Sequence, residues 1–142
     1  MKTLIFLFTA IFSITVWATE RNSPYTEQTN PEAHCLALNI YYEARGSSLA
    51  DKAAVSDVVL NRVKSTRYPD SVCEVVYQAK RAQSGQPIRN QCQFSWFCDG
   101  KSDIPLEADA WYEARVIAYQ IYHNGRFKGI TEGADHYHST SV

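Results

Sequence analysis

The sequence predicts an α+β fold, mainly helical with a small β-sheet, in a single domain. Apolar residues recur at helical spacing over residues 33–44, 54–63 and 108–121, and each stripe is long enough for an amphipathic helix. Two short segments, 91–97 and 134–138, have instead the aromatic-rich pattern of strands. Because the chain contains no internal repeat and no low-complexity segment, one helix-dominated domain accounts for these patterns.

The first two helices have clear boundary signals. Asn30 can cap a helix, Pro31 suits the first helical position, and Gly46 is expected to end the element. The second helix is expected to run from Leu49 to Lys64 behind a capping box formed by Ser48 and Asp51. The later elements are expected in chain order: a short helix from Asp70 to Ala79, a polar loop over 80–90, a strand over 91–97, a helix over 105–122 stopped by Asn124 and Gly125, and a strand over 134–138.

Residues 1–18 have the order of a secretory signal peptide: Lys2, then an apolar run, then the small-x-small site that ends at Ala18. The apolar run is shorter than the roughly 20 residues that span a bilayer, although an uncleaved anchor is an alternative. Residues 19–30 are polar and are expected to form a flexible N-terminal arm, which leaves 31–142 as the folded domain. We therefore expect an exported protein, periplasmic or extracellular, that contacts the membrane only through its signal segment.

The net charge of −1 argues against a nucleic-acid-binding surface, which normally needs a clustered basic excess. Four cysteines remain after signal cleavage, and an even count in an oxidising compartment favours disulfides. The spacing of Cys92 and Cys98 suits a short closed loop, and Cys35 would then pair with Cys73 by elimination. Free buried thiols and a metal site are the alternatives.

Glu43 is the most unusual polar residue of the first helix. It lies three residues after Ile40 and seven after Leu36, on the apolar face where a solvated glutamate is not expected. It also lies in the last turn, where the negative end of the helix dipole opposes a carboxylate. Both effects favour the protonated carboxyl group that a general acid supplies. Glu43 is therefore the candidate catalytic acid, and a structural ion pair with Arg45 is the alternative.

Aromatic residues are concentrated beside polar ones in three places, an arrangement that suits the apolar faces and hydroxyl groups of sugars. On a strand, Phe94 and Trp96 would share one face, for which core packing is the stronger interpretation, while Gln93 and Ser95 would share the other. The candidate substrate-binding residues are Tyr42, Gln93, Phe94, Ser95, Trp96, His136, Tyr137 and His138.

His136 and His138 would lie on one side of a strand, which is compatible with a metal ion. Hydrogen bonding or substrate contact is the favoured interpretation, because no third ligand can be identified in the sequence. We therefore expect no metal and no other cofactor.

Several blocks of the sequence together resemble the cell-wall hydrolase family of the SleB type, which includes the spore cortex-lytic enzymes. The blocks are residues 35–46 with their EARG ending, 54–63, Tyr68-Pro69 with Val72-Cys73, 92–96 (CQFSW), and 136–138 (HYH). Ser47 differs from the family, which often has an acid directly after the glycine of EARG.

The resemblance implies a lysozyme-like catalytic domain that cuts peptidoglycan between N-acetylmuramic acid and N-acetylglucosamine. It also implies lytic transglycosylase chemistry with Glu43 as catalytic acid, substrate positioning by Gln93, Ser95 and His138, and glycan strands as the partner of a monomer. One rival is a metal-dependent amidase that uses His136 and His138. The other is a non-catalytic glycan-binding remnant, which the end of the chain soon after the HYH block would explain.

Overall fold

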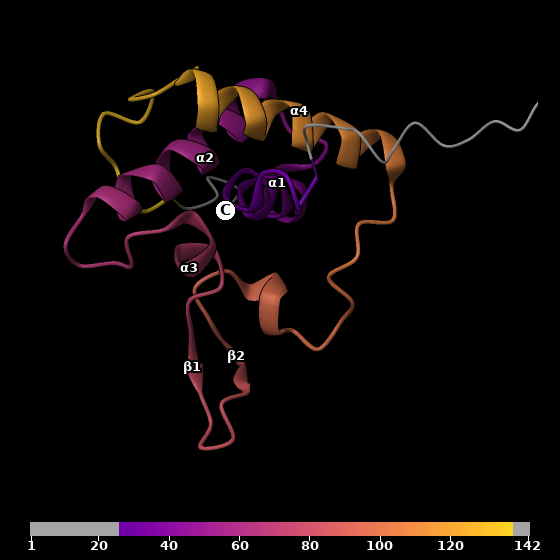
Figure 1. The fold of residues 1–142 in the computed structure, drawn as a ribbon, viewed down its shortest axis with the longest axis vertical. Helices are drawn as coiled ribbons and strands as arrows, with labels where there is room; N and C mark the ends of the chain where they lie inside the picture. The colour runs from indigo at the N-terminus through magenta and orange to yellow at the C-terminus, as the bar shows by residue number, and fades with distance from the viewer. Residues whose placement is uncertain (1–25, 138–142) are drawn as a thin grey trace, which may run out of the picture.

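The structure is a computed structural model, and it describes residues 26–137. Helix α1 (Pro31–Ala44) lies at the centre of the fold, and α2 (Leu49–Lys64), α3 (Val72–Val76) and α4 (Ala108–Asn124) pack around it. In Figure 1, α1 is seen nearly end-on, and the hairpin of β1 (Ala79–Arg81) and β2 (Pro87–Cys92) points away from the helices. The mainly helical α+β fold predicted from the sequence is thus confirmed. Within residues 26–137, no helix is both long enough and apolar enough to span a bilayer.

The core forms because α1 is apolar on nearly every side. Leu36, Ala37 and Ile40 are fully buried, and Tyr41 is 1% exposed. Such a helix is stable only when other elements cover it, and burial of each large apolar side chain stabilises the fold by about 1.5–3 kcal/mol. The position of α1 therefore fixes the arrangement of the other three helices.

The first two helices begin at the residues that the sequence predicts. The capping box of α2 is present: Asp51 N–H donates to Ser48 Oγ at 3.2 Å, and Ser48 N–H donates to Asp51 Oδ2 at 3.1 Å. Pro31 opens α1, but the Asn30 side chain makes no capping hydrogen bond, and its Nδ2 donates instead to Thr29 Oγ1 at 3.2 Å. Residues 26–30, the described part of the predicted arm, form a turn in which Asn30 N–H donates to the Thr26 carbonyl oxygen at 3.0 Å. The predicted signal peptide lies outside the described residues.

Helix α4 begins later than predicted, at Ala108 instead of Pro105. The buried Tyr41 hydroxyl accepts hydrogen bonds from the backbone N–H groups of Leu106 and Glu107, both at 3.2 Å. These bonds tie the segment before α4 to α1. The helix ends where expected, at Gly125, which has a φ of 65° that a residue without a side chain adopts at little cost.

The sheet prediction was wrong in position. Residues 79–81 and 87–92, expected mainly as a loop, form an antiparallel hairpin, whereas the predicted strand over 91–97 ends at Cys92. Ser95–Cys98 forms the 3₁₀ helix η2. A strand from Cys92 to Cys98 would separate their Cα atoms by roughly 20 Å. The Cys92–Cys98 disulfide holds these atoms 6.1 Å apart, so the chain must turn here.

The second predicted strand, over 134–138, is also absent from its described part, residues 134–137. The carbonyl oxygens of Ala134 and Asp135 accept hydrogen bonds from the Asn61 and Arg62 side chains of α2. Because side chains satisfy this backbone, it does not join a sheet.

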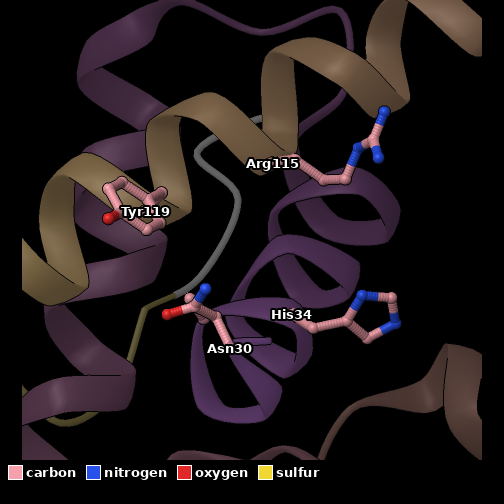
Figure 2. A pocket seen from close by; sticks show the side chains of 5 residues that line it. Asn30, His34, Arg115 and Tyr119 are labelled. Atoms are coloured by element: carbon pink, nitrogen blue, oxygen red, sulfur yellow. The ribbon is translucent and has the colours of Figure 1, made fainter. Parts of the chain in front are cut away.

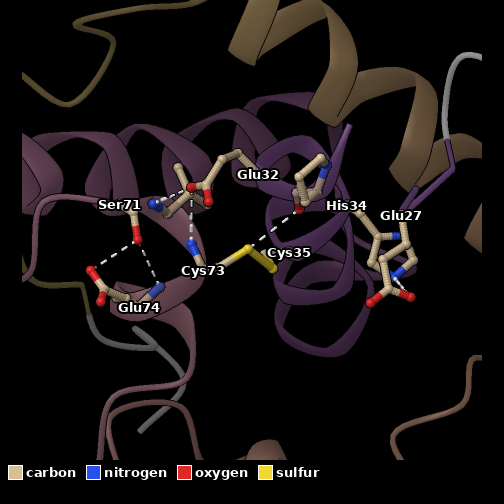
Figure 3. The surroundings of a disulfide bond; sticks show 9 residues. Glu27, Glu32, His34, Cys35, Ser71, Cys73 and Glu74 are labelled. Atoms are coloured by element: carbon tan, nitrogen blue, oxygen red, sulfur yellow. Dashed lines mark hydrogen bonds and ion pairs between the residues drawn. A yellow bond between two sulfur atoms is a disulfide. The ribbon is translucent and has the colours of Figure 1, made fainter. Parts of the chain in front are cut away.

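Both predicted disulfides are confirmed. Cys35 of α1 is bonded to Cys73 of α3, and Cys92 is bonded to Cys98. Figure 3 shows a polar contact beside the first bridge: the Glu32 carboxylate accepts the backbone N–H groups of Val72 and Cys73 at 2.6 and 3.2 Å. A side chain of α1 thus caps α3 next to the covalent bond between the same two helices.

Removal of the two disulfides is expected to have unequal effects on stability. Cys35→Ala with Cys73→Ala opens a link between residues 38 apart and should lower the free energy of unfolding by about 4 kcal/mol. Cys92→Ala with Cys98→Ala opens a link across six residues and should cost about 2 kcal/mol. Urea denaturation measures both losses. Equal losses of stability would contradict this assignment of the disulfides. Four reactive thiols in the unmutated protein after denaturation would also contradict it.

Candidate active site

Glu43 lies at the C-terminal end of α1 and borders an open cleft of about 510 Å³. The side chain is half-buried. The residues that line the cleft come from the end of α1, the start of α2 and the segment after α4, which we call the C-terminal segment (residues 125–137). They are Glu43, Ala44, Ser47, Asp51, Ala54, Val55 and Tyr137. The cleft thus combines the half-buried carboxyl group of Glu43 and the exposed carboxyl group of Asp51 with mainly small and apolar side chains.

Glu43 does not form the ion pair with Arg45 that was the alternative interpretation. Arg45 Nη1 donates instead to the Tyr41 hydroxyl at 2.8 Å and lies 3.3 Å from Glu107 Oε1. Glu43 is therefore not held by the base nearest to it in the sequence.

The partner of Glu43 is Tyr137, whose hydroxyl group donates a hydrogen bond to Glu43 Oε2 at 3.0 Å. Partial burial and the negative charge of Glu43, which also accepts this hydrogen bond, raise the pKa of Tyr137 well above its ordinary value. The phenol accordingly keeps its proton at neutral pH and remains a donor. The two residues are 94 positions apart in the chain, so the contact depends on how the C-terminal segment is held.

Asp57 of α2 holds the start of that segment. Its carboxylate accepts the Gly129 and Thr131 backbone N–H groups at 2.8 and 3.0 Å and the Thr131 hydroxyl at 2.6 Å. Burial alone would raise the pKa of Asp57, but these three hydrogen bonds outweigh it and keep the pKa below its ordinary value. Asp57 is 1% exposed, so the negative charge is buried with its donors.

Asn61 and Arg62, on the following turn of α2, extend this attachment toward Tyr137. Asn61 Nδ2 donates to Thr131 Oγ1 at 3.1 Å and to the Ala134 carbonyl oxygen at 2.9 Å. Arg62 Nε donates to the Asp135 carbonyl oxygen at 2.7 Å. We call Asp57, Asn61 and Arg62 the α2 anchor, because together they hold residues 129–135 in place. This segment ends two positions before Tyr137.

Arg62 is 3% exposed and lies between two aromatic rings. Its guanidinium carbon is 5.4 Å from the centre of the Tyr68 ring and 5.3 Å from that of Phe94. Such cation–π contacts stabilise a desolvated guanidinium group. Phe94, predicted as a substrate contact, therefore packs in the core against the anchor.

The other predicted aromatic contacts also lie away from the cleft lining. Trp96 is 6% exposed, donates from Nε1 to Asn39 Oδ1 at 3.2 Å and stacks on Tyr42 with ring centres 4.8 Å apart. Gln93 and Ser95 are exposed, but the prediction that they share one strand face was wrong, because Gln93 precedes η2 and Ser95 is its first residue. Of the substrate-binding candidates, Tyr137 is the one that lines the Glu43 cleft within residues 26–137.

His136 is exposed and its Nδ1 lies 2.6 Å from Asp135 Oδ1, while Arg67 pairs with the other carboxylate oxygen of Asp135. The hydrogen bond from His136 and the charge of Arg67 lower the pKa of Asp135 below its ordinary value. His138 lies outside the described residues. Among residues 26–137, no three His, Cys, Asp or Glu side chains are grouped closely enough to hold a metal ion.

The sequence interpretation missed the α2 anchor and the cleft lining from α2. A signal for the anchor was present, since Asp57 stands among Val55, Val58 and Val59 on an apolar helix. An acid in such a place needs a partner, but the sequence cannot say that the partner is the backbone of residues 129–131.

A second hollow, too narrow to admit a water molecule, lies between the start of α1 and α4, and Figure 2 shows Asn30, His34, Arg115 and Tyr119 around it. Burial, together with the positive charge of Arg115, lowers the pKa of His34 despite the opposing effect of Glu27. His34 also meets Trp111 edge to face, with ring centres 5.4 Å apart. The hollow is therefore part of the packing between the two helices.

Residues 46–142 match the cell wall hydrolase family. The match covers most of the chain, and it includes the anchor, Asp51 and Tyr137, while Glu43 lies three residues before its first residue. Neither the curated proteins nor the solved structures gave a match.

Replacement of Asp57 by Asn should lower the free energy of unfolding by about 2–4 kcal/mol at neutral pH, because a charged acceptor of three hydrogen bonds is lost. Since the pKa of Asp57 is lower in the folded chain, its stabilisation is present at neutral pH and is lost as the pH falls below about 4. Urea denaturation at several pH values should show the difference between the two proteins shrinking in acid. The exposed Asp70→Asn is the matched control. A difference that grows in acid would contradict this role.

Proposed function

Because the chain belongs to the cell wall hydrolase family, we propose that it cuts the glycan strands of peptidoglycan, outside the cytoplasm, as a lytic transglycosylase. The bond cut is the one between N-acetylmuramic acid and N-acetylglucosamine. The observation that carries the proposal is the half-buried carboxyl group of Glu43 in an open cleft, with one oxygen held by Tyr137. Family membership supports peptidoglycan as the substrate, and the cleft supports Glu43 as the acid.

In this proposal Glu43 makes both proton transfers. Its protonated carboxyl group gives a proton to the glycosidic oxygen while the bond from C1 of muramic acid to that oxygen breaks, and C1 gains oxocarbenium character. The carboxylate then takes the proton of the 6-hydroxyl group of the same sugar, and O6 bonds to C1. The products are a 1,6-anhydro sugar end and a free 4-hydroxyl group, with no water consumed.

Tyr137 is proposed to orient Glu43 for both transfers. Its hydroxyl group holds Oε2, which leaves Oε1 to face the glycosidic oxygen. Because a half-buried carboxyl group has several rotamers, a fixed partner reduces the cost of reaching the reactive geometry. The raised pKa of Tyr137 keeps it from competing as a proton source.

Glycosidases that use water or an enzyme nucleophile normally need a second carboxylate. A reaction that uses the 6-hydroxyl group of the substrate instead of water needs only one. Four other acids have contacts of their own: Asp57 with residues 129–131, Glu74 with Ser71, Asp99 with Lys101, and Asp135 with Arg67 and His136. Their engagement elsewhere favours chemistry with a single carboxyl group.

Asp51 is the observation that favours a second candidate, a muramidase that uses water. It borders the Glu43 cleft, although its Oδ2 is occupied by Ser48 N–H and by the Ser48 hydroxyl at 2.8 Å. Because the Oδ2 atom of Asp51 is engaged in the capping box of α2, we place the transglycosylase first.

Digestion of purified peptidoglycan, with the products identified by mass, distinguishes the candidates. The proposal predicts muropeptides with 1,6-anhydro ends, which are 18 Da lighter than the hydrolysis products because no water is added. Reducing ends would support the muramidase, and free stem peptides would support an amidase. Either of these results in place of anhydro ends would overturn the proposal.

Replacement of Glu43 by Gln should lower kcat on peptidoglycan by at least 10²–10⁴-fold, roughly the range of one general acid–base step, because both transfers depend on this group. The melting temperature should change little, since Gln can still accept the Tyr137 hydrogen bond. The matched control is Glu107→Gln, which should keep its activity. Glu107 precedes α4 and pairs with Arg45 at the end of α1. A stable Glu43→Gln protein with near-normal turnover would end this mechanism.

Replacement of Tyr137 by Phe should lower kcat roughly tenfold or more, with a smaller effect on KM, because a hydrogen bond to a charged group is lost at the site of proton transfer. Tyr122→Phe is the matched control, since Tyr122 has the same 40% exposure and lies on α4. A rise in KM with unchanged kcat would instead make Tyr137 a simple substrate contact.

A further inference from the structure

The β1–β2 hairpin carries an excess of positive charge. Lys80, Arg81 and Arg89 lie on it, and no Asp or Glu occurs between Glu74 and Asp99. The whole chain has a net charge of −1, so the positive charge is local to this part of the molecule. Figure 1 shows the hairpin projecting away from the helices, where a large ligand can reach it.

The three basic side chains of the hairpin are exposed and are not neutralised by an acid in the part of the chain that the structure describes. Arg81 Nη1 donates to the Gly85 carbonyl oxygen at 3.1 Å across the turn of the hairpin, and this bond leaves its charge uncompensated. Among the other exposed bases, Arg45, Arg67 and Lys101 each pair with a carboxylate, whereas Lys64, Arg126 and Lys128 do not within residues 26–137. The hairpin therefore presents charge that is available to an anionic ligand.

Two open grooves of about 350 and 380 Å³ meet at Gln78 and Ala79, where the hairpin joins the helices. Arg81 and the exposed Glu74 both border the first groove, and Lys80 borders the second. The second is lined otherwise by Gln78, Ala79, Gln91, Cys92 and Gln93, a set with amide side chains and no acid. Gln78 lines both grooves, and its Oε1 is buried and accepts no hydrogen bond from the described residues.

We propose that this hairpin surface, made of Gln78, Lys80, Arg81, Arg89, Gln91 and Gln93, binds the peptide stems of peptidoglycan through their carboxylates. The choice of polymer rests on the proposed function. A stem carries free carboxylates and backbone amides, which match basic side chains and glutamine side chains, respectively. Acids are absent from the groove beside Lys80, and a neutral glycan alone would gain nothing from three unpaired cations.

The hairpin surface is separate from the Glu43 cleft. The first groove is lined by Cys73, which is bonded to Cys35 near the start of α1, whereas Glu43 lies eight residues further along the same helix. Eight residues of helix extend roughly 12 Å. The hairpin would therefore hold stems of the polymer at one end of α1 while a glycan strand enters the cleft at the other end.

The test measures binding to purified peptidoglycan from which teichoic acids have been removed, with Glu43→Gln present throughout so that digestion cannot intervene. The variant Lys80→Gln with Arg81→Gln and Arg89→Gln removes the hairpin charge. Lys64→Gln with Arg126→Gln and Lys128→Gln removes the same charge from exposed sites elsewhere. A double variant, Lys80→Gln with Arg89→Gln, keeps the Arg81–Gly85 hydrogen bond and guards against a misfolded hairpin.

We expect the hairpin triple variant to bind about tenfold more weakly at low salt, with the double variant intermediate and the control triple variant near normal. The difference should vanish near 1 M salt, where charges are screened beyond roughly 3 Å. Amidation of the stem carboxylates should lower the affinity of the protein with an unchanged hairpin to that of the triple variant.

Three results would overturn the proposal: equal losses in the hairpin and control variants, full binding to peptidoglycan whose stem carboxylates are amidated, or a hairpin effect that appears only when teichoic acid phosphates are present. Failure of the proposed function is seen separately, because it would appear as turnover by Glu43→Gln or as the wrong products. Turnover of a short stem-free glycan by the hairpin variants, measured without the Glu43 change, should be unaffected.

Discussion

The arrangement of the site depends on one buried interaction, the contact of the Asp57 carboxylate with the backbone of residues 129–131. A buried negative charge is tolerable only when donors surround it, and here Gly129, Thr131 and the Thr131 hydroxyl group supply them. The same bonds satisfy backbone N–H groups in a segment that forms neither a strand nor a helix. Asp57 therefore stabilises α2 against the C-terminal segment and also fixes the path of the chain toward Tyr137.

Glu43 and Tyr137 are held in place by two different kinds of interaction. Glu43 is carried by α1, whose position is set by apolar packing on nearly every side. Tyr137 is carried by an irregular segment, whose position is set by hydrogen bonds from Asn61 and Arg62. Helix α2 contributes to both, because it packs on α1 and anchors the segment. A rigid acid and a partner held by polar contacts are consistent with a cleft that stays open to a long polymer.

The sequence was most informative for the helices, and it missed the β1–β2 hairpin. The stripes and capping residues located α1, α2 and α4 within a few residues, and the apolar face of α1 singled out Glu43. It failed where distant residues decide the outcome. The Cys92–Cys98 bridge forces a turn at a place with strand-like alternation, and the Tyr41 hydroxyl group engages backbone that would otherwise begin α4. Phe94 and Trp96 have the composition of a sugar-binding face, but they pack against Arg62 and Tyr42, respectively.

If the α2 anchor acts on catalysis by placing Tyr137, a double-mutant cycle on kcat shows it most directly. Turnover of peptidoglycan is compared for Asp57→Asn, Tyr137→Phe and the double variant, at a temperature where all three proteins are folded. If the anchor works by placing the Tyr137 hydroxyl group, the double variant should be no slower than the slower single variant. Independent effects that multiply in the double variant would contradict the claim.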